Sequence, residues 1–435
     1  MHIKKYILFF CLSMFVGLAH AADIPNGKSG WNIGFMPFAA YNSDLGLQLG
    51  GLANVYYYGD GKQYPAYQHS WYAEISHFSK GSGLYRFFYD TEYLLPGYKL
   101  SIDALYMPDQ ALDFFGFNGY DAVFQPDWID EYAASYQSRM FYKHERNLLR
   151  FKIDMQHSTP IPHTRWVVGY AFKQFTVNEV NINQLNKGKE PHEQLPAIDG
   201  LYAKYIDWGI ISATEAKGGI HHDITTGLVY DTRNNEPCPT QGIWSEIVLL
   251  NSFHPEFTYG KLALTHRQYF PITSQLSSAI RIGYQQHIYG KSPFYLYPYM
   301  VYSYLPSPEI DGIGGSKTVR GILRNRIVGN GVAFGNAELR YKFWHFQLFK
   351  QQWYAALNPF VDAGMVVDKI PLQITHITED ITPYFASNAE KIHLSYGCGI
   401  RAAMNENFVL ATDIGFPLSK QDGTMGLYIG INWLF

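Results

Sequence analysis

The stretch Asn336-Ala337-Glu338-Leu339-Arg340-Tyr341-Lys342-Phe343 alternates polar and apolar side chains without a break. Successive side chains of a β-strand point to opposite faces, so one face of this segment is polar and the other is apolar. A lysine or arginine facing lipid would cost up to about 2–4 kcal/mol at the bilayer midplane. The alternation therefore predicts a strand that separates an apolar surrounding from a polar interior.

Two further segments, 275–290 and 352–367, repeat this alternation on either side. As strands they would share the same division between an outer and an inner face. The outer set is Ile280, Ile282, Tyr284, Leu357, Val361, Met365 and Val367, and the inner set is Arg281, Gln285, His287, Asn358, Phe360 and Asp362. We expect a polar lumen that carries charges of both signs.

The composition agrees with a membrane location. Charged residues make up 16% of the chain and aromatic residues 17%, with 35 tyrosines, whereas about 25% of a soluble domain is charged. Backbone groups in lipid must bond internally, so a chain without long apolar helices can span only as a closed barrel. The sequence predicts an all-β protein, a transmembrane antiparallel β-barrel. The net charge of −3 gives no support for a nucleic-acid partner.

We expect about 16 strands, an even number as in single-chain barrels of this kind. They are 45–58, 67–79, 83–94, 97–107, 131–144, 147–157, 164–178, 219–232, 241–253, 257–271, 275–290, 331–345, 352–367, 391–404, 406–417 and 425–435. Residues 31–41 are either a further strand or a lead-in. The long connections 179–218, 291–330 and 368–390 fall at one end, but 108–130 falls at the end where turns are short. Either a strand upstream is misplaced or this turn is unusual.

The first residues are typical of a signal peptide. Lys4 and Lys5 precede an apolar run, and Ala19-His20-Ala21 places small residues where a signal peptidase cleaves. The run is shorter than the roughly 20 residues of a membrane helix. We expect a signal peptide over 1–21, cleaved near Ala21, a short N-terminal segment over 22–44, and the barrel over 45–435.

The last residues also alternate. Leu427, Ile429, Ile431, Trp433 and Phe435 share one face of an expected strand. A terminal aromatic residue on such a strand resembles the signal that the barrel assembly machinery reads, with Ile431, Trp433 and Phe435 as its residues. The alternative is a buried final strand in a soluble sandwich.

A glycine-flanked arginine precedes the strand quoted first: Gly314-Gly315, then Val319-Arg320-Gly321-Ile322. One strand further on stands Phe360-Val361-Asp362-Ala363-Gly364. Both segments resemble motifs of the outer-membrane barrel superfamily that includes BamA and the two-partner-secretion transporters, although Ile322 replaces the family's Phe or Tyr. The resemblance implies a long loop six that folds into the lumen and an Arg320–Asp362 ion pair, with Glu338 nearby, Phe360 under the guanidinium and Gly364 in the same strand motif.

Two more segments support the resemblance. Tyr230-Asp231-Thr232-Arg233-Asn234-Asn235, followed by Pro239 and Gly242, resembles a superfamily pattern at a turn, although such residues also favour a plain Asx turn. Phe114-Phe115-Gly116-Phe117-Asn118-Gly119 is a pattern that some relatives carry. The resemblance covers residues 219–435 well and the first half mainly by its strand rhythm.

The resemblance implies transport or insertion of macromolecules, protein or lipid, at the outer membrane. Family members usually carry POTRA domains before the barrel, and the short segment expected here indicates the barrel-only branch. The alternatives are a passive small-solute channel and a surface-exposed interaction protein that uses loops 179–218 and 368–390. Expected partners are outer-membrane lipid and lipopolysaccharide, the assembly machinery for the chain's own insertion, and an unidentified client.

No enzymatic motif stands out. The sequence lacks a Gly-x-Ser-x-Gly elbow and a His-Glu-x-x-His site. His221-His222-Asp223 is the most metal-like cluster, but adjacent strand residues point to opposite faces. We expect no catalysis, cofactor or metal, and no disulfide between Cys238 and Cys398.

Overall fold

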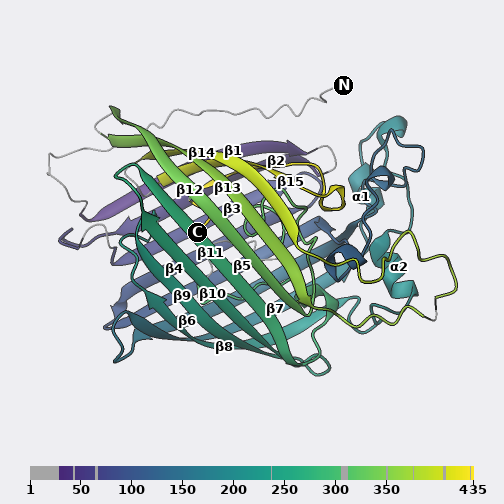
Figure 1. Ribbon diagram of the computed structural model, residues 1–435, viewed down its shortest axis with the longest axis horizontal. Coiled ribbons are helices and arrows are strands. Elements are labelled where there is room, and N and C mark those ends of the chain that lie inside the picture. The colour runs from purple at the N-terminus through teal and green to yellow at the C-terminus, as the bar shows by residue number, and fades with distance from the viewer. Residues whose placement is uncertain are drawn as a thin grey trace.

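Sixteen antiparallel strands form one continuous sheet in chain order. The structure, a computed structural model, describes residues 29–42, 45–63, 67–236, 238–304, 312–348, 351–375, 377–404, 408–431 and 433–435. Figure 1 shows the tilted strands curving round into a barrel. The expected all-β transmembrane barrel is confirmed. The expected signal peptide lies outside the described residues.

The strand bounds are as follows. They are β1 (Trp31–Asn42), β2 (Gly46–Tyr57), β3 (His69–Phe78), β4 (Gly83–Leu95), β5 (Tyr98–Asp113), β6 (Lys143–Ser158), β7 (Thr164–Asn178), β8 (Gly218–Asp231), β9 (Gly242–Phe253), β10 (Tyr259–Pro271), β11 (Leu276–Gly290), β12 (Gly331–Leu348), β13 (Gln351–Asp368), β14 (His393–Met404), β15 (Phe408–Pro417) and β16 (Gly426–Ile431).

Short helices occupy some of the connections. They are α1 (Ile182–Asn186), α2 (Leu201–Asp207) and the 3-10 helices η1 (Gly119–Asp121), η2 (Pro126–Trp128), η3 (Pro191–Glu193), η4 (Phe294–Leu296) and η5 (Lys420–Asp422). Helices α1 and α2 lie beyond the strand ends at the right of Figure 1. No helix in the described ranges is long and apolar enough to cross a membrane.

The strand prediction at 131–144 was wrong, and the alternative left open at 31–41 is decided in favour of a strand, so the count stays at 16. Residues 131–142 form turns, and β6 begins only at Lys143. Trp31–Asn42 is a strand paired with β2, so the sheet begins before residue 45, where we expected the barrel to start. Pro37 lacks an N–H and is tolerated because β1 pairs with β2 alone in the described part of the chain.

These corrections remove the conflict over orientation. The segment 108–130 belongs partly to β5, and the long connection that follows it runs from 114 to 142. With β1 counted, this connection lies at the same end as 179–217, 291–330 and 369–392. The four longest connections therefore share one end of the barrel.

The predicted division into inner and outer faces is confirmed. On β11, Ile282 is 57% exposed whereas Arg281 is 4% exposed. On β12, Leu339 is 45% exposed and Glu338 is 2% exposed. The charged side chains of these strands are buried within the barrel, where they meet loop six.

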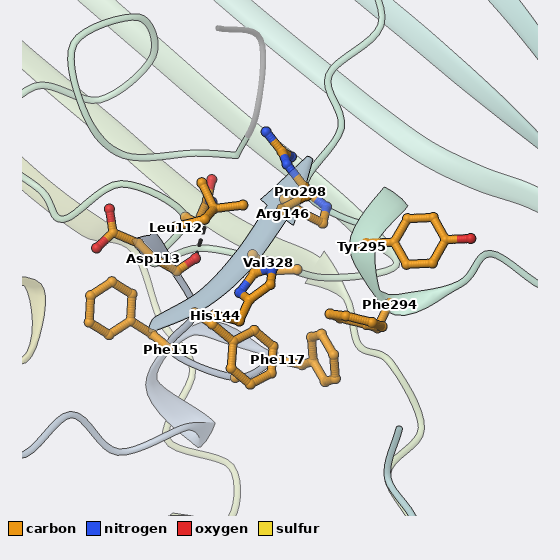
Figure 2. A pocket seen from close by; sticks show the side chains of 13 residues that line it. Leu112, Asp113, Phe115, Phe117, His144, Arg146, Phe294, Tyr295, Pro298 and Val328 are labelled. Carbon is orange, nitrogen blue, oxygen red and sulfur yellow. Dashed lines mark hydrogen bonds between the residues drawn. The ribbon is translucent and has the colours of Figure 1, made fainter. Parts of the chain in front are cut away.

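The long connections pack together into a cluster that we call the loop cap, residues 114–142, 179–217, 291–304, 369–375, 377–392 and 418–425. Its centre is aromatic: Phe114 makes edge contacts with Phe117, Tyr205 and Phe294. Figure 2 shows Phe115, Phe117, His144 and Phe294 around a small cavity in this cluster. Residues 131–142 are drawn into the cap because Phe141 and Tyr142 bury their rings there. This packing overrides the strand pattern of that segment.

The end of the chain also departs from its prediction. Leu427 and Ile429 are exposed on the outer face, but Trp433 and Phe435 are buried. The strand ends at Ile431. Phe435 turns inward because the Arg340 guanidinium donates to its carbonyl oxygen at 2.7 Å and the Arg281 guanidinium lies 4.9 Å from its ring. The expectation that Trp433 and Phe435 share the outer face is therefore wrong.

Candidate functional site in the lumen

Loop six turns back on itself to form a finger, residues 312–327. An isolated bridge joins Ile313 to Ile327 at its base. Its turns use Gly314, Gly315 and Gly321, with φ of 113°, 79° and 89°. Backbone conformations with positive φ suit glycine because it has no Cβ. The Thr318 hydroxyl accepts from the Gly314 N–H at 2.9 Å, which closes the finger.

Apolar side chains fix the finger to the wall. Val319 and Ile322 are 0% and 1% exposed, and they pack in one cluster with Val332, Phe334 and Val366. Ile322, which stands where the resemblance leads us to expect an aromatic residue, is thus buried. A Cβ at Gly364 would lie 3.0 Å from Ile313 and Ile327 side-chain atoms. Glycine at 364 therefore allows the finger to approach β13 closely.

Arg320 is fully buried and contacts carboxylates from three strands. Its Nε and Nη2 donate to Asp362 Oδ2 and Oδ1 at 2.8 and 3.0 Å. Its Nη1 lies 2.8 Å from Glu338 Oε1 and 3.7 Å from Asp413 Oδ1. The planar guanidinium matches a carboxylate in this two-bond geometry, which a lysine ammonium cannot reproduce.

Two further contacts fix the orientation of Arg320. Its backbone N–H donates to Asp362 Oδ2 at 3.0 Å. Its guanidinium carbon lies 3.5 Å from the centroid of the Phe360 ring. The face of an aromatic ring attracts a cation, and this attraction is stronger away from water. The Phe360 ring therefore packs against the face of the Arg320 guanidinium, while the carboxylates bind the N–H groups at the edge of the guanidinium.

Residues that the sequence analysis did not assign to the site complete it. Asn336 Nδ2 donates to the Thr318 carbonyl at 2.7 Å, and Arg281 Nη2 donates to the Lys317 carbonyl at 3.0 Å. The Gly321 N–H donates to the Tyr428 hydroxyl at 3.0 Å. Inward parity placed Arg281 and Asn336 in the lumen, and the same rule applied to β15 and β16 points Asp413 and Tyr428 inward. Parity does not reveal which inward residues meet the finger.

Arg340 connects this site to the end of the chain. Its Nε donates to Glu338 Oε2 at 3.0 Å, and its Nη2 donates to the Phe435 carbonyl. Its guanidinium carbon also lies 4.6 Å from the Trp433 ring centroid. Because Glu338 also contacts Arg320, a continuous buried network runs from Asp362 to Phe435.

The turn after β8 reaches the same network. The Asp231 carboxylate accepts from Arg233 Nε and Nη2 at 2.9 and 2.8 Å. The Pro239 carbonyl accepts from Arg340 Nη1 at 3.3 Å. The third motif is therefore more than a plain turn, since it contacts the interior beside residues 433–435.

The metal-like cluster is divided between two faces. His221 and Asp223 are buried, and Asp223 pairs with Lys173. His222 lies on the other face, where its Nδ1 contacts the Tyr170 hydroxyl at 2.9 Å. Within the described ranges, no group of three or more His, Cys, Asp or Glu residues is placed to hold a metal ion. Cys238 and Cys398 are both free.

Comparisons with known proteins agree with this geometry. The Omp85 superfamily domain matches residues 118–433. BamA from Haemophilus ducreyi, in a form lacking POTRA domains 1–3, has a similar structure, with a TM-score of 0.52 and 13% identity over 93% of this chain and 71% of that chain. CdiB from Escherichia coli has a TM-score of 0.50 and 10% identity over 94% of this chain and 62% of that chain. A comparison with curated proteins finds no match.

At these identities the two structures show a shared fold alone. The superfamily match covers more than half of the chain and includes the finger, the Asp362 strand and the third motif. The chain therefore belongs to the Omp85 superfamily of outer-membrane β-barrels.

Proposed function

We propose that this barrel moves macromolecules, protein or lipid, across or into the outer membrane, and that the loop-six finger is the part that moves. The observation that carries the proposal is the set of Arg320 contacts with Asp362, Glu338 and Asp413. They join a loop to three strands that are already paired through their backbones. The arginine is thus placed to hold or release the loop without breaking the sheet.

The energetics support a positional role for Arg320. A buried ion pair often contributes little net stability, because desolvation of both charges offsets their attraction. Such pairs are better known for fixing one arrangement over another. At Arg320, the ion pairs fix the inward position of the finger. Glu338 also contacts Arg340, which binds the Phe435 carbonyl, so the position of the finger is coupled to the position of Phe435.

A second part of loop six opposes the passive-channel alternative. Residues 297–304 lie in the lumen, where Lys261 Nζ donates to the Tyr299 carbonyl at 2.6 Å. Gln285 both donates to and accepts from the Val301 backbone at 2.8 and 2.9 Å. The Ser303 N–H donates to Glu246 at 2.8 Å. A steady pore for solutes would require this specifically bonded segment to be displaced.

We propose the same partners as the sequence suggested: outer-membrane lipid and lipopolysaccharide, the assembly machinery and a client. We also propose that the role is not enzymatic. The buried network holds its charges in mutual contacts, and none of its side chains is presented as a nucleophile with a base. Its chemistry suits holding a loop in place.

A reversible crosslink tests whether the finger gates the barrel. Val319 Cγ2 lies 3.2 Å from the Cβ that a side chain at Gly364 would carry, within the reach of a disulfide. We would combine Val319→Cys and Gly364→Cys with Cys238→Ser and Cys398→Ser, and record single-channel currents in a planar bilayer. We expect a quiet oxidised barrel and large, flickering openings after reduction.

Gly364→Cys alone, in the same cysteine-free background, is the matched control, because it adds the same Cβ beside the finger but cannot form the crosslink, and it should be insensitive to reductant. Folded protein is selected by its faster migration on an unheated gel. A steady conductance in both redox states would overturn the proposal in favour of a passive pore. Silence in both states would overturn it in favour of a surface interaction protein.

A further inference from the structure

A cluster of polar side chains ties the loop cap together around His393, the first residue of β14. His393 Nδ1 lies 2.6 Å from Asp422 Oδ1, and its Nε2 lies 3.2 Å from Glu390 Oε2. The ring of Tyr120 stacks on the imidazole with 3.8 Å between centroids. His393 and Asp422 are fully buried. One imidazole therefore faces a carboxylate through each of its nitrogens.

The same two carboxylates hold backbone from other connections. Glu390 Oε2 accepts from the Tyr120 N–H, and Glu390 Oε1 accepts from the Val366 N–H, each at 2.8 Å. A Cβ at Gly119 would lie 2.0 Å from Glu390 Oε2. Glycine is thus required there, which gives the Phe114–Gly119 motif a physical role. The motif brings the first long connection against the carboxylate at 390.

Asp422 extends these contacts to loop six. Its backbone carbonyl accepts from the Leu323 N–H at 3.0 Å, and its Oδ2 accepts from the Tyr120 hydroxyl at 2.5 Å. Arg326 donates to the Gly119 and Ala122 carbonyls at 2.7 and 2.9 Å. Both Leu323 and Arg326 belong to the finger. The cluster therefore holds the finger from the cap side, opposite Arg320.

The charged groups around His393 are few. Arg326 Nε lies 3.9 Å from Asp422 Oδ1, and Lys391 Nζ lies 5.7 Å from the Tyr120 ring centroid. Asp121, one step away, pairs with Lys369 at 2.5 Å. Burial, followed by the bond to Asp422, raises the pKa of Tyr120 above its ordinary value, so this hydroxyl stays a donor. Among the described side chains of this cluster, the imidazole of His393 is the type of group that ordinarily changes its charge near neutral pH.

A neutral imidazole has one N–H donor and one acceptor nitrogen, whereas an imidazolium has two donors. The protonated ring can donate to both Asp422 and Glu390. The neutral ring would set a lone pair against one of the two carboxylates, and an unmatched buried polar group is costly. We propose that this cluster is a proton-dependent latch, which holds the finger to the loop cap when His393 is protonated and loosens when the proton leaves.

The latch does not depend on what the barrel transports. It can therefore be tested by measuring the local stability of the loop cap and the finger, without a transport assay. Histidine ordinarily changes charge between about pH 5 and 8. We would measure amide hydrogen-exchange protection factors, which correct for the intrinsic pH dependence of exchange, at pH 5.5 and 8.5 in lipid nanodiscs. For segments 118–124 and 320–327 we expect about tenfold lower protection at the higher pH, as for one unit of differential protonation. Strand β6 should keep its protection.

Glu390→Gln removes one of the two carboxylates that an imidazolium faces, while its amide oxygen can still accept from the Tyr120 N–H, so its protection should depend less on pH than in wild type. His393→Gln should lose the pH dependence. His221→Gln is the matched control, because His221 is equally buried but contacts the Tyr295 and Ser252 hydroxyls, and it should behave as wild type. Equal wild-type protection at both pH values, or a pH dependence in His393→Gln as large as in wild type, would overturn the latch.

Discussion

Two groups of buried ion pairs lie in the lumen, one on the early strands β4 to β6 and one on the late strands β12 and β13. The two groups join different parts of the chain. On the early strands, Asp103 of β5 binds Arg86 of β4 at 2.6 Å and Arg150 of β6 at 2.8 Å. On the late strands, Arg320 comes from a loop and binds Asp362 and Glu338 of the wall. The first group connects strands that are already hydrogen-bonded neighbours. The second connects segments that no backbone ladder joins.

This difference shows how the same chemistry serves two purposes. In the Asp103 group, the ladders would keep β4, β5 and β6 together if the ions were removed. In the Arg320 group, no ladder joins the finger to β12 or β13 in the described part of the chain, and side-chain contacts and apolar packing hold it against them. Removal of a charged side chain from the Asp103 group should therefore lower the stability of the sheet. The same kind of change in the Arg320 group should alter the position of the loop.

The largest effect is expected for Arg320→Ala. It leaves Asp362 buried without its partner and Glu338 with Arg340 alone, and the loss of one partner of a desolvated pair costs roughly 3–5 kcal/mol. We expect a lower urea midpoint in lipid vesicles, a smaller folded fraction on unheated gels, and more frequent channel openings.

Arg324→Ala is the control within the same loop. Arg324 is about one-third exposed and pairs with Asp109 and Asp113 at 3.3 and 3.2 Å. Partly exposed pairs contribute about 0–1 kcal/mol. Equal stability losses in both variants would contradict the special position of Arg320.

A smaller effect is expected for Asp103→Asn. It removes a charged acceptor from Arg86 and Arg150, and hydrogen bonds to charged groups contribute about 1.5–3 kcal/mol. We expect a lower urea midpoint with wild-type channel behaviour. If Asp103→Asn also opened as often as Arg320→Ala, the Asp103 group would control the position of the loop as the Arg320 group does, and the proposed difference between the two groups would be wrong.

The smallest of the three is expected for Phe360→Leu. The ion pair remains and the side chain stays apolar, but the ring under the guanidinium is lost, at a cost of about 0.5–2 kcal/mol. A modest fall in the urea midpoint should accompany a small rise in openings. Phe151→Leu on the outer face, where the ring is 45% exposed, is the control. A loss no greater than in that control would show that Phe360 does not support Arg320.

The strand predictions show where local patterns suffice. Alternation identified the faces of β11, β12 and β13, because a charged side chain on those strands has no acceptable place except the lumen. It failed at 131–144, where Phe141 and Tyr142 bury their rings in the loop cap instead of in a sheet. It was ambiguous at β1, where Pro37 argues against a central strand and only the edge position permits it.

The candidate site divides in the same way. Its motifs were found in sequence, including Arg320, Phe360 and Asp362. Tyr428, Asp413 and the Arg340 contact with Phe435 were not, because each depends on which inward side chains face each other across the lumen. The inward turn of Trp433 and Phe435 reverses a face that alternation alone assigns to lipid.

The chain's own pattern was enough to establish a barrel with a polar interior, since the period of two and the cost of charge in lipid act on each strand separately. It also contained the glycines and the arginine of the finger. The meeting of the finger, the loop cap and residues 433–435 depends on distances between segments far apart in the chain. The curvature of the sheet around a common lumen brings them together, and no local rule specifies that outcome.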